Sequence, residues 1–548
     1  MRQIGSNIVS WSERKTKADR EYMLNLLEKY GEEETNLKLG GGNKRIEIQH
    51  NKGRMTARER IDVLLDKGSD FLELGLYAAW GMYEEYGSPP GAGVVVGIGK
   101  VSGNDCVIIA NDATVKAGAY FEVTLKKHLR GQRIALENNI PVIYLVDSAG
   151  VFLPLQDQVF PDEAHFGRIF FNNARLSALG IPQIAAVMGP CVAGGAYLPV
   201  MCDKFIMTEG SNLFLAGPAL VKAAIGQDID KEILGGATTH NAISGTADYH
   251  TKNDREAIEL IRQLIGNLGV RDRGHFNRKA SNDPLYLVDD LNAIVPKDGG
   301  TYNMEEVLAR IIDGSEFEPY KVEYGKTVIC GHARIGGYSV GIVANQKDVM
   351  KSELGEMQMG GVIYSDSADK AARFIMNCNQ DRIPLIFFHD VNGFMIGKKA
   401  EWGGIAKDGA KMVQAVSNSV VPKITIIIGG SFGAGNYAMS GRAYEPRFMY
   451  MWPTANLAVM GGSQAANTLV EIRLAKMKEN VSEEQRRQMV EKIKAIYDIQ
   501  SDPRYAAARL WTDAIIKPEK TRDVIIRSLE ICENQPKMPA PVFGVLQV

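Results

Sequence analysis

The amino-acid sequence predicts an α/β protein built from two copies of one folding unit, each with a largely parallel β-sheet and crossover helices. Four segments recur in the same order about 240 residues apart, which indicates an internal duplication. Within each copy, short strands rich in Val and Ile alternate with amphipathic helices, a pattern typical of crossover units. Several strands are apolar throughout, as expected for a sheet covered on both faces.

The duplication is clearest at the predicted central strands. IPVIYLVDSAG, from Ile140, matches IPLIFFHDVNG, from Ile383, and this offset of 243 residues pairs Asp147 with Asp390. IPQIAAVMGPCVAGGAY matches VPKITIIIGGSFGAGNY at an offset of 240. The other two pairs are GKVSGNDCVIIAND with ARIGGYSVGIVANQ, and SNLFLAGP with ANLAVMGG. We therefore predict two homologous domains, residues 1–290 and 291–548, joined through the poorly patterned stretch 282–300.

The remaining elements follow from apolar periodicity. We predict helices over 53–66, 166–179 and 404–416, and we assign the segment before the first strand to the first domain. Buried strands are predicted at VIYLV, IAAVM and ITIII. Residues 176–202 carry no charge, but three prolines and four glycines would break a membrane helix there. A strand, a tight turn and a helix start fit that segment better.

Composition excludes several classes of function. With 63 basic and 65 acidic residues, nothing favours nucleic acid or an anionic membrane as a partner. The 6 cysteines include no C-x-x-C pair, so we expect no metal site and no disulfide framework. The first 22 residues have no apolar core and contain acidic side chains, unlike a signal or transit peptide. We expect a cytoplasmic protein, or one of the mitochondrial matrix if the source is eukaryotic.

Both copies contain a buried strand that ends in a glycine cluster and runs directly into a helix. The clusters are MGPCVAGGAY and GGSFGAGNY. Small residues leave backbone N–H groups accessible, and a helix start adds free donors and the positive end of the helix dipole. Such a turn can stabilise a developing oxyanion. Tight packing of strand against helix is the alternative explanation, and the repetition of the turn favours the chemical one.

The second cluster also fits G-x-S-x-G, the nucleophile turn of serine hydrolases, with Ser431 as the nucleophile. That fold needs its histidine after the serine, whereas the last histidine here is His389. The first copy has Cys191 where the serine stands. We therefore interpret Ser431 as a small spacer and His389 as a buried histidine with satisfied hydrogen bonds.

The motifs closely resemble those of the carboxyltransferase β subunits of biotin-dependent acyl-CoA carboxylases, over nearly the whole chain. The segments that carry the resemblance are GRMTARERID, VFPDEAHFGRIF, AGGAY, GPALVKAAIG, GIAKDGAKM, SFGAGNYAMSGRAY and WPTANLAVMGG. The resemblance implies tandem duplicated crotonase-like (ClpP/crotonase) domains. Within the family, LPLQDQVFPDEAHFGRIFFNNAR and the ending FGVLQV are most similar to members that act on methylcrotonoyl-CoA, in leucine catabolism.

The resemblance also implies the roles of the two turns. The first domain would bind acyl-CoA, with Gly194 and Gly195 holding the thioester oxygen as the enolate forms. The second would receive biotin, with Ala434 and Gly435 holding its ureido oxygen. Alanine replaces the glycine of the first turn but still supplies an N–H. In this family the biotin anion removes the substrate proton, so that no protein base is required.

Further substrate-binding candidates are less specific. Core packing competes with acyl-group contact for four aromatic residues, and solvation competes with CoA phosphate binding for two lysines. These candidates are Phe152, Phe160, Phe166, Phe394, Lys116 and Lys222. We expect no metal ion in this chain.

Partners follow from what the sequence lacks. No segment has the flanks of a biotin attachment site, so a biotin carboxylase and biotin carboxyl carrier α subunit is implied. The resemblance further implies a hexameric β core in an α6β6 assembly. Alternatives are a geranyl-CoA or other acyl-CoA carboxylase β subunit, the carboxyltransferase of a sodium-pumping acyl-CoA decarboxylase, and a non-catalytic CoA-binding core. Two intact glycine turns argue against the last.

Overall fold

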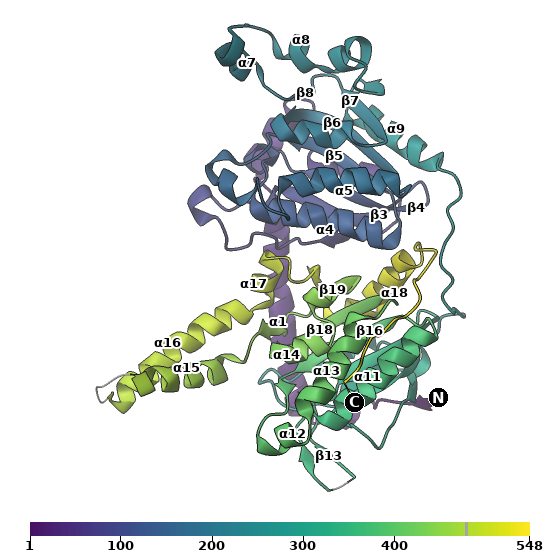
Figure 1. The fold of residues 1–548 in the computed structure, drawn as a ribbon, viewed down its shortest axis with the longest axis vertical. Helices are drawn as coiled ribbons and strands as arrows, with labels where there is room; N and C mark the ends of the chain where they lie inside the picture. The colour runs from purple at the N-terminus through teal and green to yellow at the C-terminus, as the bar shows by residue number, and fades with distance from the viewer. Residues whose placement is uncertain (354, 477–480, 548) are drawn as a thin grey trace.

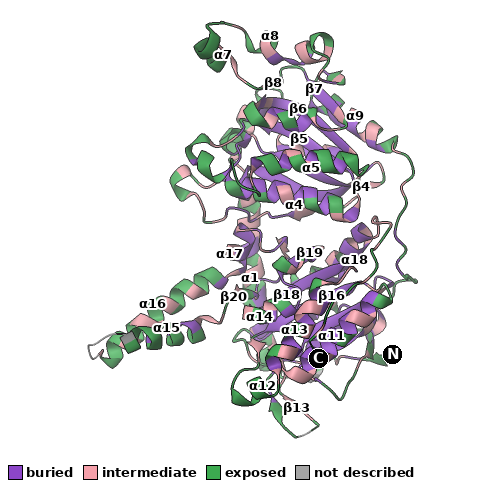
Figure 2. Cartoon of the chain, in the orientation of Figure 1, coloured by how far each residue is buried: buried purple, intermediate pink, exposed green. Residues whose placement is uncertain are grey.

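A computed structural model describes residues 1–353, 355–476 and 481–547. Its strands form two large sheets, one in the upper half of Figure 1 and one in the lower half. In Figure 2 the strands of both sheets are buried, while α7, α8, α15 and α16 are largely exposed. The tandem α/β architecture predicted from the duplication is therefore present.

The first sheet has the strand order β2-β3-β4-β5-β6-β7-β9, with β8 paired to β6. Its strands are β2 (Leu72–Leu74), β3 (Val94–Val101), β4 (Asn104–Asn111), β5 (Val142–Ser148), β6 (Gln183–Val192), β7 (Lys204–Thr208), β8 (Asn212–Phe214) and β9 (Tyr249–Thr251). The pairs from β4 onward are parallel, while β2, β3 and β4 pair antiparallel. The β3–β4 hairpin is one of the four repeated segments.

The second sheet repeats this order as β10-β11-β12-β16-β18-β19-β21, with β20 paired to β18. Its strands are β10 (Glu316–Pro319), β11 (Val328–Ile335), β12 (Tyr338–Asn345), β16 (Leu385–Val391), β18 (Lys423–Phe432), β19 (Phe448–Met451), β20 (Asn456–Ala458) and β21 (Ala514–Ile515). Two small ribbons pair β13 (Met350–Lys351) with β14 (Met357–Gln358), and β15 (Val362–Ile363) with β17 (Gly393–Phe394). All four repeated segments thus occupy equivalent strands in the two sheets.

Helices cover both sheets. Those before residue 290 are α1 (Glu13–Lys38), α2 (Asn43–His50), α3 (Ala57–Leu64), α4 (Glu122–Asn138), α5 (Phe166–Ala178), α6 (Tyr197–Val200), α7 (Pro218–Ile225), α8 (Lys231–Gly235) and α9 (Asp254–Gly266). Those after it are α10 (Met304–Leu308), α11 (Ser365–Gln380), α12 (Lys398–Trp402), α13 (Ile405–Ser417), α14 (Gly433–Ala438), α15 (Gly462–Lys476), α16 (Glu483–Ser501), α17 (Pro503–Ala508) and α18 (Thr521–Cys532). The predicted helices correspond to α3, α5 and α13.

Local sequence explains the start of α3. Thr56 accepts a hydrogen bond from the backbone of Glu59, whose carboxylate accepts one from the backbone of Thr56. This capping box satisfies two N–H groups that a helix start leaves free. It begins α3 within the GRMTARERID motif.

The first residues of the chain lie at the edge of the second sheet, where β1 (Arg2–Gln3) pairs with β10. The sequence pattern instead predicts that this segment belongs to the first domain. A strand of two residues is too short to show apolar periodicity. Its pairing therefore depends on the tertiary structure, in which α1 connects it to the rest of the first half. In Figure 1, α1 runs alongside both halves of the molecule.

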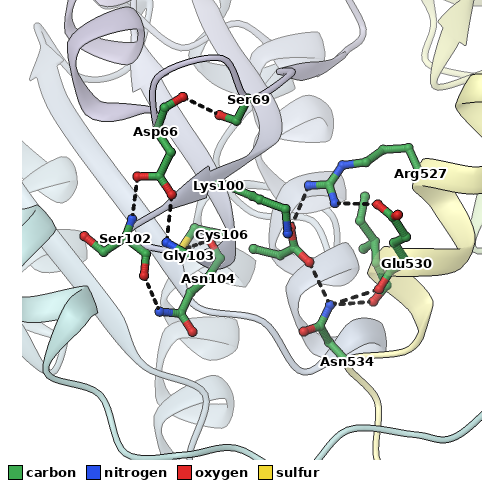
Figure 3. Close-up of polar contacts among 12 residues, drawn as sticks. Asp66, Ser69, Lys100, Ser102, Gly103, Asn104, Cys106, Arg527, Glu530 and Asn534 are labelled. Carbon is green, nitrogen blue, oxygen red and sulfur yellow. Dashed lines mark hydrogen bonds and ion pairs between the residues drawn. The ribbon is translucent and has the colours of Figure 1, made fainter.

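Ion pairs and backbone hydrogen bonds join the two halves. The guanidinium of Arg130 on α4 lies 2.8 Å from the Asp513 carboxylate, and the N–H of Gly75 donates to the Asp513 carbonyl at 2.7 Å. At the other contact, Asp105 of β4 accepts hydrogen bonds from Arg527 and Asn534, which extend from the α18 region. Figure 3 shows Arg527 and Asn534 of this contact beside the β3–β4 turn, where Asp66 accepts hydrogen bonds from the N–H groups of residues 102 and 103.

In the described residues, no helix is both long and apolar enough to cross a membrane. The uncharged stretch 176–202 forms the end of α5, the strand β6, the glycine turn and α6. This is the strand, turn and helix start that the sequence predicted.

Candidate functional site

Both glycine turns follow a bulge at the same point of the sheet. In the first sheet, β5 and β6 pair up to Val146 with Val187 and resume at Ser148 with Cys191, so Asp147 alone faces three residues. In the second, the pairing of β16 with β18 skips Asp390 in the same way. Bulges redirect a strand and are common beside active sites. On their other edge, β6 and β18 pair with β7 and β19 before the bulge and with β8 and β20 beyond it.

The residue that starts each turn has a left-handed backbone. Ala193 has φ +56° and Gly433, at the equivalent position, has φ +52°. Only glycine adopts this conformation without steric cost, so Ala193 is held there by its surroundings. The duplication therefore extends to the backbone conformation of the turns, as a shared function would require.

The residues predicted to supply N–H donors come immediately after Ala193 and Gly433 in the chain. Gly194 and Ala434 are exposed, Gly195 is half-buried and Gly435 is buried. A Cβ on Gly195 would meet no atom within 4 Å, so open space adjoins this residue. A Cβ on Gly435 would lie 2.6 Å from Val391, and this position is therefore glycine because it packs closely on β16.

An aromatic ring, that of Phe166, lies beside the first turn. A Cβ on Gly194 would lie 3.9 Å from the Phe166 ring, which packs edge-on against Tyr120 with ring centroids 4.9 Å apart. Phe152 stacks on Phe121 at 4.4 Å. The structure thus brings Phe152 and Phe166 to the same end of the sheet as Gly194.

The other candidates lie apart from this group or are exposed. Phe160 is 70% exposed, on the segment before α5. Phe394 belongs to β17, next to Gly393, and adjoins the second turn. Lys116 is exposed, while Lys222 on α7 forms an exposed ion pair with Asp228 at 2.7 Å. Among these candidates, Phe166 therefore lies beside the first turn, and Phe152 packs on Phe121 at the same end of the sheet.

Ser431 lies in a buried hydrogen-bonded chain rather than in an open nucleophile site. His389 Nε2 donates to the carbonyl of Met439, so its Nδ1 accepts from the Ser431 hydroxyl at 2.9 Å. Asn436 Nδ2 in turn donates to Ser431 Oγ at 2.8 Å. Burial lowers the pKa of His389 to about 4, which keeps the ring neutral. Ser431 and His389 are both inaccessible to solvent, so no substrate reaches this pair.

The first copy has no such chain. Cys191, at the position of Ser431, donates weakly to the Gly195 carbonyl at 3.5 Å. Burial raises the pKa of the Cys191 thiol to about 12, so it is not a thiolate nucleophile. Backbone N–H groups remain the feature that the two turns share.

A carboxylate lies behind each turn, and the sequence did not indicate its partners. In the first domain Arg60, 1% exposed, binds Asp147 at 3.1 Å and Asp254 at 2.7 Å. In the second, Asp390 accepts from Lys347 at 2.6 Å and from the Tyr302 hydroxyl at 3.0 Å. The repeat pairs Asp147 with Asp390, and that match could have drawn attention to both. Nothing local connects Arg60, Tyr302 or Lys347 with them.

Among the described residues, no group of three or more His, Cys, Asp or Glu side chains could hold a metal ion. The chemistry that the arrangement supports is stabilisation of negative charge at two separate backbone turns. This arrangement, with one such turn in each of two equivalent sheets, is what the resemblance to carboxyltransferase β subunits implies.

Comparisons with known proteins agree. A family model described as a carboxyl transferase domain matches residues 48–546. The methylcrotonoyl-CoA carboxylase beta chain of Dictyostelium discoideum is 48% identical over 518 residues, which cover 93% of this chain and 86% of that one. The biotin-dependent 3-methylcrotonyl-coenzyme A carboxylase beta1 subunit of Mycobacterium tuberculosis is 48% identical over 502 residues, covering 90% and 92%.

Among solved structures, the beta subunit of P. aeruginosa geranyl-CoA carboxylase aligns over 100% of both chains with a TM-score of 0.87 at 35% identity. The chain belongs to the carboxyl transferase family. It is therefore an enzyme component, as the two turns predicted.

Proposed function

We propose that this chain is the carboxyltransferase β subunit of a biotin-dependent acyl-CoA carboxylase and that its substrate is 3-methylcrotonoyl-CoA. The observation that carries the proposal is the pair of equivalent bulged turns, one in each domain. The substrate is supported by two relatives at 48% identity whose names specify methylcrotonoyl-CoA carboxylase. Reaction with this thioester belongs to leucine degradation.

The two domains would serve the two reactants, with residues 1–290 binding acyl-CoA and residues 291–548 binding biotin. The N–H groups of Gly194 and Gly195 would hold the thioester oxygen as the γ carbon loses its proton and a dienolate forms. A well-placed donor to such an oxyanion is worth about 100 to 1,000 fold in rate. The open space beside Gly195 supports this role.

The second turn would hold the ureido oxygen of biotin through the N–H groups of Ala434 and Gly435. Biotin, carried by the partner subunit, supplies the carboxyl group and the basic nitrogen. Ala434 is exposed, so this part of the turn lies at the surface where a group carried by another subunit can arrive. The buried Gly435 keeps the turn close to β16.

The acyl chain would pack near Phe166, which adjoins the first turn, and near Phe152, which lies at the same end of the sheet. Phe394 would complete the pocket only where a second copy of the chain contributes to it, since it adjoins the second turn. Phe160 would contribute from the exposed segment before α5. Lys116 is the better candidate for a CoA phosphate, because Lys222 is already paired with Asp228.

This function requires an α subunit that carries biotin and the biotin carboxylase activity, and we propose an α6β6 assembly with a hexameric β core. We propose the cytoplasm as its compartment; the related chains of Dictyostelium discoideum, Drosophila melanogaster and Arabidopsis thaliana are named mitochondrial. Geranyl-CoA is the second candidate substrate, because the geranyl-CoA carboxylase beta subunit matches the whole chain.

The test is to copurify the chain with its biotinylated partner and to measure ATP-dependent carboxylation of 3-methylcrotonoyl-CoA, geranyl-CoA and propionyl-CoA. The highest kcat/KM is expected for 3-methylcrotonoyl-CoA. A higher value for another thioester would refute the substrate but not the class of enzyme. No carboxylation of any thioester by a folded complex would refute both.

A further inference from the structure

We propose that Asp147 and Asp390 are positioning residues, each holding the glycine turn of its own domain, so that each governs one of the two reactants. This inference rests on the proposed function, in which the first turn meets acyl-CoA and the second meets biotin. Both carboxylates are buried, with relative exposures of 2% and 3%. Their role is to fix the backbone that carries the donors.

The two carboxylates press against the backbone of the bulges. A Cβ on Gly189 would lie 2.0 Å from an Asp147 carboxylate oxygen, and a Cβ on Gly429 would lie 2.4 Å from one of Asp390. Only glycine permits this approach. The donors follow five and six residues after each of these glycines, so a shift of the bulge would move them.

In the second domain, the carboxylate is hydrogen-bonded directly to the backbone of the bulge. The N–H of Gly430 donates to Asp390 Oδ1 at 2.9 Å, and Lys347 Nζ binds the same oxygen at 2.6 Å. The hydroxyl of Tyr302 donates to the other carboxylate oxygen at 3.0 Å. A charged acceptor with these three donors holds Gly430 more firmly than a neutral one would.

In the first domain, the carboxylate holds the backbone of the bulge through a different set of contacts. Pro190 stands at the position of Gly430 and has no N–H to donate. Instead, Arg60 binds Asp147 at 3.1 Å and donates to the carbonyl of Met188, within the bulge, at 3.3 Å. Asp147 therefore acts on the turn through Arg60.

The second bulge has room to move if this hold is lost. A cavity of about 240 Å³ adjoins it, lined by Tyr302, Lys347, Asp390, Gly429, Gly430 and Thr454, among others. A displacement of reacting groups by about 1 Å can lower a rate about 100-fold. Loss of the Asp390 charge is thus expected to weaken the use of biotin and to leave acyl-CoA binding intact.

The experiment uses the complex with its biotinylated partner for carboxylation at varied 3-methylcrotonoyl-CoA. The reverse transfer, from the carboxylated thioester to free biotin, is measured at varied biotin. In that transfer the C–C bond to the carboxyl group breaks and a C–N bond to biotin forms, while the N1 proton of biotin passes to carbon. We expect Asp390→Asn to raise the KM for free biotin or lower kcat by at least tenfold, with the KM for acyl-CoA changed less than twofold.

Asp147→Asn should show the opposite split, raising the KM for acyl-CoA by at least tenfold. Tyr302→Phe removes one donor without leaving a charge unpaired, and a change of about threefold in the direction of Asp390→Asn is expected. The matched control is Asp313→Asn, since Asp313 is also buried and accepts from the N–H groups of Gly336 and Gly337. It should lower the melting temperature and change neither KM.

If folded Asp390→Asn and Tyr302→Phe complexes retain wild-type constants for biotin, the inference is wrong. Equal shifts in both KM values would also overturn it, because a general structural role predicts them. If Asp390→Asn does not fold, Tyr302→Phe decides alone. A wild-type complex that transfers no carboxyl group refutes the proposed function itself, which separates the two failures.

Discussion

At the scale of single residues, Ser431 distinguishes a serine nucleophile from stabilisation of negative charge by backbone N–H groups, both of which its motif allows. A nucleophile would have to reach solvent, yet Ser431 is buried and its hydroxyl links Asn436 to His389. Ser431→Ala should therefore keep kcat within about threefold. It should also lower the free energy of unfolding by about 1–3 kcal/mol, because buried partners lose a hydrogen bond. Chemical denaturation and carboxylation assays measure the two effects.

Ser431→Cys is the matched control, because the first domain carries Cys191 at this position. It keeps a weak donor and should be less destabilising than alanine. A loss of more than about 1,000-fold in kcat for a folded Ser431→Ala enzyme would instead identify a nucleophile.

Gly195 tests the backbone donors of the first turn. Gly195→Pro deletes an N–H, and we expect carboxylation to fall by about 100 to 1,000 fold. Gly195→Ala keeps the N–H and adds a Cβ that meets no atom within 4 Å, so it should retain activity within about tenfold. Equal losses in both variants, with unchanged melting temperatures, would contradict the role of the N–H.

At the scale of an element, the turn between β18 and α14 depends on a left-handed residue. Gly433 has φ +52°, and an added Cβ would lie 3.0 Å from the carbonyl of Val459. Gly433→Ala should lower the free energy of unfolding by about 1–2 kcal/mol. Gly461→Ala, at a nearby glycine with open space and no left-handed backbone, should change it by less than about 0.5 kcal/mol. Similar values for the two would show that the turn is not strained.

The strands and turns were largely predictable from the sequence because each pattern occurs in both copies of the repeat. Apolar runs located β5, β6 and β18, and the glycine clusters located both turns. The edge position of β1 was not predictable, since two residues carry no period. Nor were the partners of Asp147 and Asp390, because Arg60 and Lys347 are 87 and 43 residues away in the chain and meet them only through tertiary packing. The exposure of Phe160 was missed because its apolar side chain alone gives no sign of it.

At the scale of the whole molecule, the two halves are joined through buried charges rather than through apolar contact alone. Asp513 of the second half binds Arg130 of the first at 2.8 Å and Arg442 at 3.0 Å. Burial by itself would raise the pKa of Asp513, but the two guanidinium groups outweigh it and lower that pKa from 3.8 to about 2. At the second contact, burial of Asp105 is likewise outweighed by Arg527, so its pKa is also lowered.

A pKa that is lower in the folded state than in the unfolded state stabilises the fold at pH values above the unfolded pKa. For Asp513, this contribution is complete above about pH 4 and is lost as the pH falls from 3.8 towards 2. A shift of this size corresponds to about 2 kcal/mol.

We therefore expect the difference in unfolding free energy between the wild type and Asp513→Asn to shrink as the pH is lowered from 6 to 3. Urea titrations at each pH measure it. Asp228→Asn, which alters an exposed pair, should show a small difference that does not depend on pH in this way. A wild-type advantage that grows as the pH falls would show that the link between Arg130 and Asp513 does not stabilise the joined halves.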